Sequence, residues 1–267
     1  AWRAGEPNRE TQFIFEHAGL SMPELLTFPL TDRDVWLVDF TEPAQGPDSL
    51  AESNVVGIID HHRLGGLMTS LPPEVWMKPV GSSATLLWQL MSEEERRQIS
   101  SSEAVLLLGA ILSDTVTLRS PTTTADDCQA VDALVEKTGV DREAFCRDLL
   151  SAKTSVEGMS ARQLLNKDCK TFTIHGLQVC VAQLELYALD QVAPVLDDLR
   201  AEMVRYAEER HAVLVVLMLT DINKGDTSLW FAGKELTDIA QPCKVEGMLS
   251  RKKQMLPWLE NHLKPRQ

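Results

Sequence analysis

The chain has 267 residues, of which 44% are hydrophobic and 24% are charged. These proportions are those of an ordinary soluble globular protein with one or two domains. It has no apolar run of the roughly 18 residues that a membrane span needs. The formal net charge of −13 argues against nonspecific binding of nucleic acid, whose phosphates need a basic surface. Any anion site must therefore be built from local basic residues or metals.

The five cysteines are scattered along the chain and form no CxxC pair. An odd, scattered set is typical of reduced thiols rather than of a disulfide framework or a zinc site. The first residues, Ala1 to Pro7, lack the apolar segment of a secretory signal. We therefore expect a cytoplasmic protein.

The first half of the chain alternates short apolar strands with helices. Strands are predicted at three places: 35–39, 55–59 and 75–77. Helices, several of them opened by Ser or Thr caps, are predicted at five places: 10–17, 81–91, 101–112, the segment before Gly139, and 141–151. This alternation predicts an α/β domain with a mainly parallel sheet.

The composition changes near residues 153–160, where apolar side chains become few. We place a linker there, between a first domain at 1–152 and a second at 161–267. The predicted elements of the second part follow in this order: a helix at 159–166, strands at 170–174 and 178–182, a long helix at 189–209, strands at 213–219 and 227–231, a loop at 247–254 and a helix at 256–263. This order predicts a smaller α+β domain.

Three apolar runs end in residues that bind metals. One ends in Asp60-His61-His62, another in Asp39 and a third in Asp114. Ligands of open α/β sheets bind at the carboxyl ends of the strands. Carboxylates together with imidazoles suit Mn, Zn, Co or Fe(II) better than Ca. Any one of these aspartates alone is more simply a helix cap or a loop residue, but the three together predict a metal site.

These motifs resemble those of the DHH superfamily of phosphoesterases, and within it the family II, manganese-dependent inorganic pyrophosphatases. The signature is Asp60-His61-His62, and the most discriminating addition is 250–254, Ser-Arg-Lys-Lys-Gln, which resembles the substrate motif of the DHHA2 domain. Further matches extend the resemblance over nearly the whole chain: 38–39, 80–85, 112–115, 120–124, 168–172 and 220–222. The fold implied is an N-terminal DHH domain, with a mainly parallel sheet flanked by helices, and a smaller DHHA2 domain with a mixed sheet.

The resemblance implies a role for each matching residue of the first domain. Asp39 corresponds to the carboxylate that bridges two metals, and His61 and Asp114 correspond to ligands of the second metal. His62 corresponds to a residue that contacts the substrate, and with Asp39 and Asp114 it forms the implied catalytic set. Asp60 is interpreted as an outer partner that orients a histidine.

In the second domain the matching residues are cations. Lys170 aligns with the family's substrate lysine, and Arg251 and Lys252 align with the pair that grips the distal phosphate. Lys253 is expected to add only to the local positive field. A basic run alone is more simply a solvated flank of a helix, but the other matches in this domain favour a substrate-binding role.

The resemblance also implies the cofactor and the partners. Two Mn²⁺ or Co²⁺ ions are expected per site, with Mg²⁺ arriving with the substrate, which is pyrophosphate. Two metals clamp the attacking and leaving oxygens of such a displacement. Because the metal ligands and the cations fall in different domains, we expect the domains to close around the linker during catalysis. A homodimer is expected, without nucleic-acid or membrane partners.

One family motif is absent. No His-x-x-x-Asp-x-Asp is found in the chain, and His17 does not replace it. We interpret the chain as shortened rather than as an inactive descendant, and expect weak or no catalysis without the missing ligands. Two other functions stay open: another DHH phosphoesterase, such as an exopolyphosphatase or a nucleotide phosphodiesterase, and a non-catalytic binding module. A substrate panel separates the first from a pyrophosphatase, and the metal content separates the second.

Overall fold

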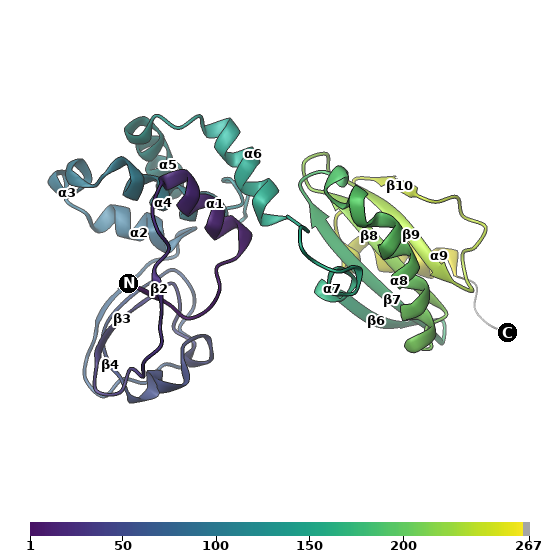
Figure 1. The fold of residues 1–267 in the computed structure, drawn as a ribbon, viewed down its shortest axis with the longest axis horizontal. Helices are drawn as coiled ribbons and strands as arrows, with labels where there is room; N and C mark the ends of the chain where they lie inside the picture. Colours follow the sequence, from purple (N-terminus) through teal and green to yellow (C-terminus); the bar gives the residue numbers. More distant parts are fainter. Residues whose placement is uncertain (264–267) are drawn as a thin grey trace. The chain divides into compact units, whose positions relative to one another are not determined.

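The computed structural model describes residues 1–263 and shows two compact units, Ala1–Lys153 and the part of the chain from Thr154 onward (Figure 1). Helix α6 (Arg142–Lys153) ends the first unit. Within residues 1–263, no helix is long and apolar enough to cross a membrane.

The first unit contains a parallel sheet with the strand order β3-β4-β5. The bounds of these strands are Asp34–Val38 for β3, Asn54–Asp60 for β4 and Glu74–Met77 for β5. The three predicted strands and their parallel direction are therefore confirmed. Because β3 and β4 are neighbours that run the same way, their carboxyl ends bring Asp39 and Asp60 to one edge of the sheet. A short parallel pair, β1 (Trp2–Arg3) with β2 (Glu24–Leu25), was not predicted, since two residues carry no periodicity.

The helices of the first unit begin at well-defined caps. Thr124 and Ser100 each form a reciprocal capping box, with Asp127 and Glu103 respectively. The bounds are α1 Arg9–Ala18, α2 Ser83–Leu90, α3 Glu93–Gln98, α4 Ser101–Asp114 and α5 Ala125–Thr138. Helix α3 was not predicted, because its sequence, EEERRQ, has no apolar stripe.

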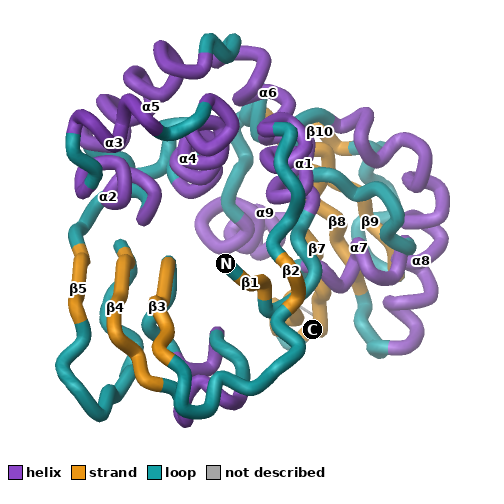
Figure 2. Tube along the Cα trace, turned by 60° about the vertical axis from the view of Figure 1, so that its left-hand side comes forward, coloured by secondary structure: helices purple, strands orange, loops and turns teal. Residues whose placement is uncertain are grey.

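The helices and the sheet of the first unit have separate cores. Helices α1, α2, α4, α5 and α6 pack around residues such as Leu108, Leu134 and Phe145. The sheet packs on its own small cluster, which is Leu37, Leu50, Val55 and Ile58. Figure 2 shows the helices gathered beyond the carboxyl ends of β3, β4 and β5. The helical group therefore closes the edge of the sheet at which Asp39 and Asp60 lie.

The second unit is built on a mixed sheet with the order β10-β9-β8-β7-β6, in which β7 and β8 are parallel and the other pairs are antiparallel. The bounds are β6 Cys169–Ile174, β7 Leu177–Leu186, β8 Leu214–Asp221, β9 Asp226–Gly233 and β10 Cys243–Glu246. Helices α7 (Ala161–Lys167) and α8 (Leu196–Glu209) pack on one face, and α9 (Leu256–His262) packs on the other. The predicted mixed sheet is confirmed.

Two predicted elements of the second unit differ from the structure. The long helix predicted at 189–209 is divided, because Pro194 lies in a 3-10 segment, Leu189–Val195, that precedes α8. The segment predicted as a loop at 247–254 contains the first residues of a π-helical turn, Arg251–Met255, that leads directly into α9. The basic cluster therefore lies on a helical turn.

Candidate active site

Asp39 follows β3 in a backbone conformation that side chains seldom adopt. Its φ is +72°, in the left-handed region. The Asp39 N–H still donates to the Ile59 carbonyl at 2.9 Å, so the residue stays tied to β4. The Ser83 hydroxyl donates to Asp39 Oδ1 at 2.8 Å. Strained non-glycine residues persist only where neighbours hold them, and they gather at functional sites.

Asp60 organises the two histidines that follow it. It is fully buried, and its Oδ1 accepts the backbone N–H groups of His61 at 2.7 Å and His62 at 3.0 Å. The same oxygen lies 2.8 Å from His62 Nδ1. This hydrogen bond is the main reason why the pKa of His62 is raised above its ordinary value. Asp60 therefore has the contacts of a residue that orients an imidazole.

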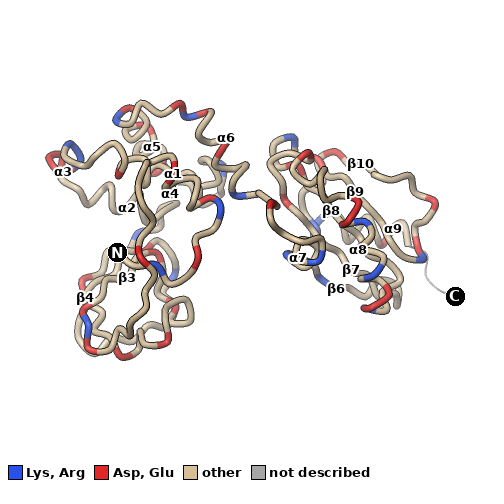
Figure 3. The backbone as a smooth tube through the Cα atoms, viewed as in Figure 1, with Lys and Arg blue, Asp and Glu red and all other residues tan. Residues whose placement is uncertain are grey.

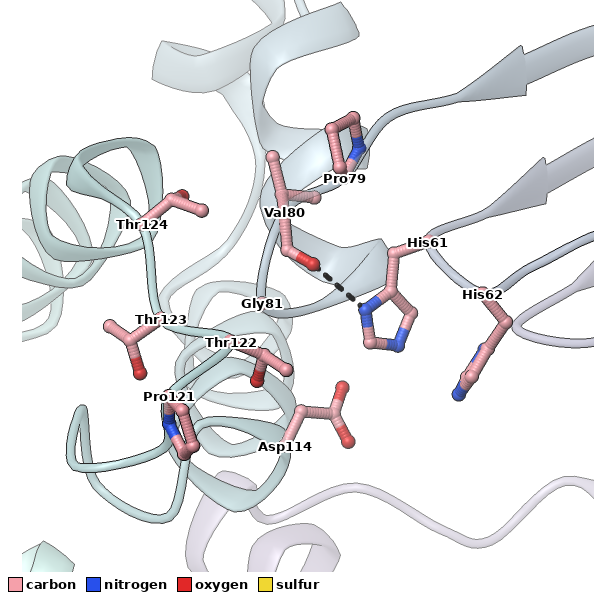
Figure 4. Close-up of a pocket in the computed structure, with 10 residues that line it drawn as sticks. All are labelled: His61, His62, Pro79, Val80, Gly81, Asp114, Pro121, Thr122, Thr123 and Thr124. Atoms are coloured by element: carbon pink, nitrogen blue, oxygen red, sulfur yellow. Dashed lines mark hydrogen bonds between the residues drawn. The ribbon is translucent and has the colours of Figure 1, made fainter.

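The ring of His61 is fixed by the main chain. Its Nδ1 lies 3.0 Å from the Val80 carbonyl oxygen, as Figure 4 shows, so this nitrogen carries the proton and donates it. The other ring nitrogen, Nε2, keeps its lone pair and lies 3.5 Å from Asp39 Oδ1. A histidine held in this way by a backbone carbonyl is typical of metal ligands.

Asp39, His61 and His62 form a compact set of ligand atoms. One such atom from each residue lies within 4.8 Å of the other two. One carboxylate and two imidazoles fit a divalent transition metal, and three protein ligands leave positions open for water or substrate. The metal ligands predicted from the sequence, Asp39, His61 and Asp114, share two residues with this set, and Asp114 lines the same pocket.

Asp114 lies at the end of α4 and lines the same pocket as the two histidines. Figure 4 shows its carboxylate directed toward their rings. Ser82 donates to Asp114 Oδ2 at 2.6 Å. Burial raises the pKa of Asp114, and the charge of Asp39 adds to this effect, while Ser82 and His61 oppose it. The charges of Asp39 and His61 thus act on Asp114, although Asp114 lies outside the set of three ligand residues.

A left-handed turn follows α4 directly. Val116, Thr117 and Leu118 have φ values of 49°, 55° and 64°. The turn is held by hydrogen bonds from the Thr117 N–H to the Leu112 carbonyl at 2.7 Å and from the Leu118 N–H to Thr115 Oγ1 at 3.1 Å. These contacts end α4 at Asp114, with Thr115 as its C-cap.

Asp127 joins the segments that carry these side chains, a role that the sequence did not reveal. It is fully buried and accepts hydrogen bonds from the Gly81 N–H at 2.8 Å and from Thr85 Oγ1 at 2.5 Å. The N–H and hydroxyl of Thr124 donate to it as well, both at 2.7 Å. Burial alone would raise the pKa of Asp127, but these hydrogen bonds outweigh it and lower the pKa. Ser82 lies inside the segment that Asp127 holds.

The cations of the second unit differ in their surroundings. Lys170 is exposed on β6, and Lys252 and Lys253 are exposed on the π-helical turn. Arg251 is only 7% exposed, and its Nη2 donates to Asp168 Oδ1 at 2.8 Å. One edge of this guanidinium is therefore already engaged within the second unit.

Gln254, the last residue of the basic motif, shapes the adjoining loop. Its Oε1 accepts the N–H groups of Leu249 and Ser250, both at 2.9 Å, and its Nε2 donates to the Gly247 carbonyl at 2.7 Å. Gln254 thus fixes the main chain just before Arg251.

Comparison with known proteins gives matching results for both units. Residues 147–262 match the DHHA2 domain. A manganese-dependent inorganic pyrophosphatase of Methanothrix thermoacetophila is 36% identical over 98% of this chain and 87% of its own. A probable enzyme of the same name from Staphylococcus epidermidis is 34% identical over 96% of this chain and 86% of its own. The crystal structure of a candidate family II inorganic pyrophosphatase from Methanococcus jannaschii superposes with a TM-score of 0.62, at 32% identity over 98% of this chain and 90% of that chain.

The fold thus defines a protein that joins a DHH-type unit to a DHHA2 domain. Within that class, the chain belongs to the family of manganese-dependent inorganic pyrophosphatases.

Proposed function

We propose that this chain hydrolyses inorganic pyrophosphate to two phosphates with Mn²⁺ as its cofactor. The observation that carries the proposal is the meeting of Asp39 and His61 at the carboxyl edge of a parallel sheet, with His62 and Asp114 beside them. When bound there, Mn²⁺ would act as a Lewis acid and bring the pKa of a water ligand toward neutrality. Family membership supports the choice of both metal and substrate.

In this proposal Asp39, His61 and Asp114 hold the metals, and Asp39, His62 and Asp114 form the catalytic set. The raised pKa of His62 keeps its imidazole protonated to a higher pH, so that it favours a phosphate oxygen and can hold a proton near the leaving group. Asp60 orients His62 through the hydrogen bond at 2.8 Å.

The cations of the second unit supply the substrate-binding residues. Lys170 and Lys252 act as point charges toward phosphate, and Arg251 as a planar donor. We assign metal chemistry to 1–152 and phosphate binding to 161–267, with 153–160 as the linker.

The test is a panel of phosphate compounds. Purified protein is incubated with Mn²⁺ and pyrophosphate, a long-chain polyphosphate or a linear dinucleotide, and the release of phosphate or mononucleotide is measured. Turnover is expected to be weak overall, since the sequence carries no His-x-x-x-Asp-x-Asp motif, and pyrophosphate is expected to turn over fastest, by at least about tenfold. A tenfold preference corresponds to about 1.4 kcal/mol, which specific polar contacts readily supply. Faster release from polyphosphate or the dinucleotide would overturn the proposal. So would a calorimetric titration in which the protein binds neither pyrophosphate nor its analogue imidodiphosphate.

We further propose that the chain forms a homodimer. Strand β5 lies at the edge of its sheet and exposes Val75 at 47% and Trp76 at 41%. An apolar exposed edge strand offers unpaired backbone groups to a second copy. Replacing Trp76 with lysine is expected to convert the dimer to a monomer in size-exclusion chromatography with light scattering. The matched control is Met68→Lys, on a loop residue that is 93% exposed, and it should leave the mass unchanged.

The proposed location is the cytoplasm, and nucleic acid is not proposed as a partner. The five cysteines are all free thiols, as expected in a reducing compartment. Acidic residues are spread over both units among the lysines and arginines (Figure 3), and the net charge is −13. A polyanion is repelled by such a surface.

A further inference from the structure

The guanidinium of Arg251 is held along one edge by a single residue, Asp168. Nη1 donates to the Asp168 carbonyl oxygen at 2.7 Å, and Nη2 donates to the Asp168 carboxylate at 2.8 Å. A weaker contact joins Nη1 to the Val181 carbonyl at 3.3 Å. The main-chain carbonyl and the carboxylate of Asp168 thus accept hydrogen bonds from the two terminal nitrogens of the guanidinium, Nη1 and Nη2.

The position of Asp168 is itself fixed by the sheet. The Asp168 carbonyl also accepts the Gln183 N–H at 3.0 Å, which extends the pairing of β6 with β7 by one residue. On the other side, the Ser250 hydroxyl accepts the Lys253 N–H at 3.2 Å and fixes the turn that carries Arg251. Both partners of the ion pair are therefore set by backbone structure.

The opposite edge of the guanidinium is left without partners. Nε of Arg251 is buried and has no hydrogen-bond partner in the described part of the chain. Nη2, which lies on the same side as the Nε hydrogen, has no second partner there. A buried N–H without an acceptor costs free energy and needs an explanation. These two parallel N–H groups form the fork that matches two oxygens of a phosphate.

We propose that Asp168 is a positioning residue for substrate: it holds one edge of Arg251 so that the Nε–Nη2 edge is presented to a phosphate group of pyrophosphate. This inference rests on the proposed function and adds a residue to it. Asp168 also lies two positions before Lys170, so the same stretch of chain places a second cation. Asp168 acts through Arg251 and makes no contact with the substrate in this proposal.

The test separates substrate binding from turnover. Asp168→Ala is expected to raise the KM for pyrophosphate and the Kd for imidodiphosphate by about tenfold, while kcat changes less than about threefold, because the binding contact is lost in ground and transition states alike. Asp168→Asn keeps an acceptor oxygen in place and should restore both constants to within about threefold of the parent protein. In an Arg251→Ala background, Asp168→Ala should add no further effect, since both changes remove the same interaction.

The control is Glu202, a carboxylate in another ion-pair network of the same unit. Glu202 pairs with Arg162 and Arg205 and is more buried than Asp168, with a side chain 8% exposed against 46%. Glu202→Gln should lower the unfolding temperature without changing KM or Kd. If Arg251→Ala weakens binding but folded Asp168→Ala does not, the positioning role is wrong and the proposed function stands. If Arg251→Ala itself changes neither constant, the phosphate role of Arg251 in the proposed function is wrong. Should Asp168→Ala fail to fold, Asp168→Glu replaces it: the displaced carboxylate should raise KM and Kd, and unchanged constants would overturn the inference.

Discussion

Replacing His61 with alanine is expected to abolish tight binding of Mn²⁺ by this protein. The His61 side chain is 13% exposed, its Nε2 lies 3.5 Å from Asp39, and its ring is already fixed by the Val80 carbonyl. Loss of an outer partner of a metal ligand weakens binding by about 10- to 100-fold, so the loss of the ligand itself should cost at least about 100-fold. Pyrophosphate turnover should fall to background with it.

The measurement is a calorimetric titration with Mn²⁺, together with the metal content by mass spectrometry after dialysis. His175→Ala is the matched control, because His175 is an exposed imidazole in the other unit whose Nε2 contacts the Glu260 carbonyl. It should bind Mn²⁺ as the parent protein does. A His61→Ala protein that keeps the parent's affinity and metal content would show that the cluster is not the metal site.

Replacing Asp127 with alanine is expected to have the largest effect on stability. The change removes the acceptor for hydrogen bonds from Gly81, Thr85 and Thr124, all at a fully buried position. At about 1 kcal/mol for each of the four bonds, the free energy of unfolding of the first unit should fall by roughly 3–5 kcal/mol. The unfolding midpoint should fall by roughly 6–20 °C, as scaled for a unit of this size. Mn²⁺ affinity should fall as well, because Ser82 and Ser83 lose the anchor of their segment.

Thermal unfolding followed by circular dichroism, with Asp126→Ala as the control, checks this expectation. Asp126 lies beside Asp127 in the first turn of α5 but makes no hydrogen bond through its side chain within residues 1–263. Its removal should cost less than about 1 kcal/mol, the value of one charge near a helix N-terminus. Equal shifts for the two variants would contradict the central role given to Asp127.

The sequence was most informative where one local pattern decides the structure. An apolar run that ends in Asp39, or in Asp60-His61-His62, predicts a strand with polar residues at its end, and parallel neighbours then bring the ends together. The sequence could not decide which side chains approach most closely. That choice depends on the rotamer of His62 set by Asp60 and on the point where α4 ends, and neither leaves a periodic signal.

Contacts between distant residues were beyond prediction for a similar reason. The ion pair of Arg251 with Asp168 joins positions 83 residues apart, and they meet because the segment that carries Arg251 lies against β7. Asp127 was recognisable as the third residue after a helix cap at Thr124. Its bonds to Gly81 and Thr85, 46 and 42 residues away, depend on how α2 packs against α5.

The turn at residues 116–118 has a consequence for the direction in which Asp114 points. Left-handed backbone costs roughly 1–2 kcal/mol of conformational free energy for each such residue. The turn at 116–118 therefore forms at an appreciable cost in free energy. Helices usually fray over their last residues, and successive positions are rotated by about 100° around the axis. Asp114 is the last residue of α4, so a helix that ended one residue earlier would no longer hold its carboxylate toward the histidines. The left-handed turn fixes the end of the helix at Asp114, and in doing so it keeps the Asp114 carboxylate at the pocket.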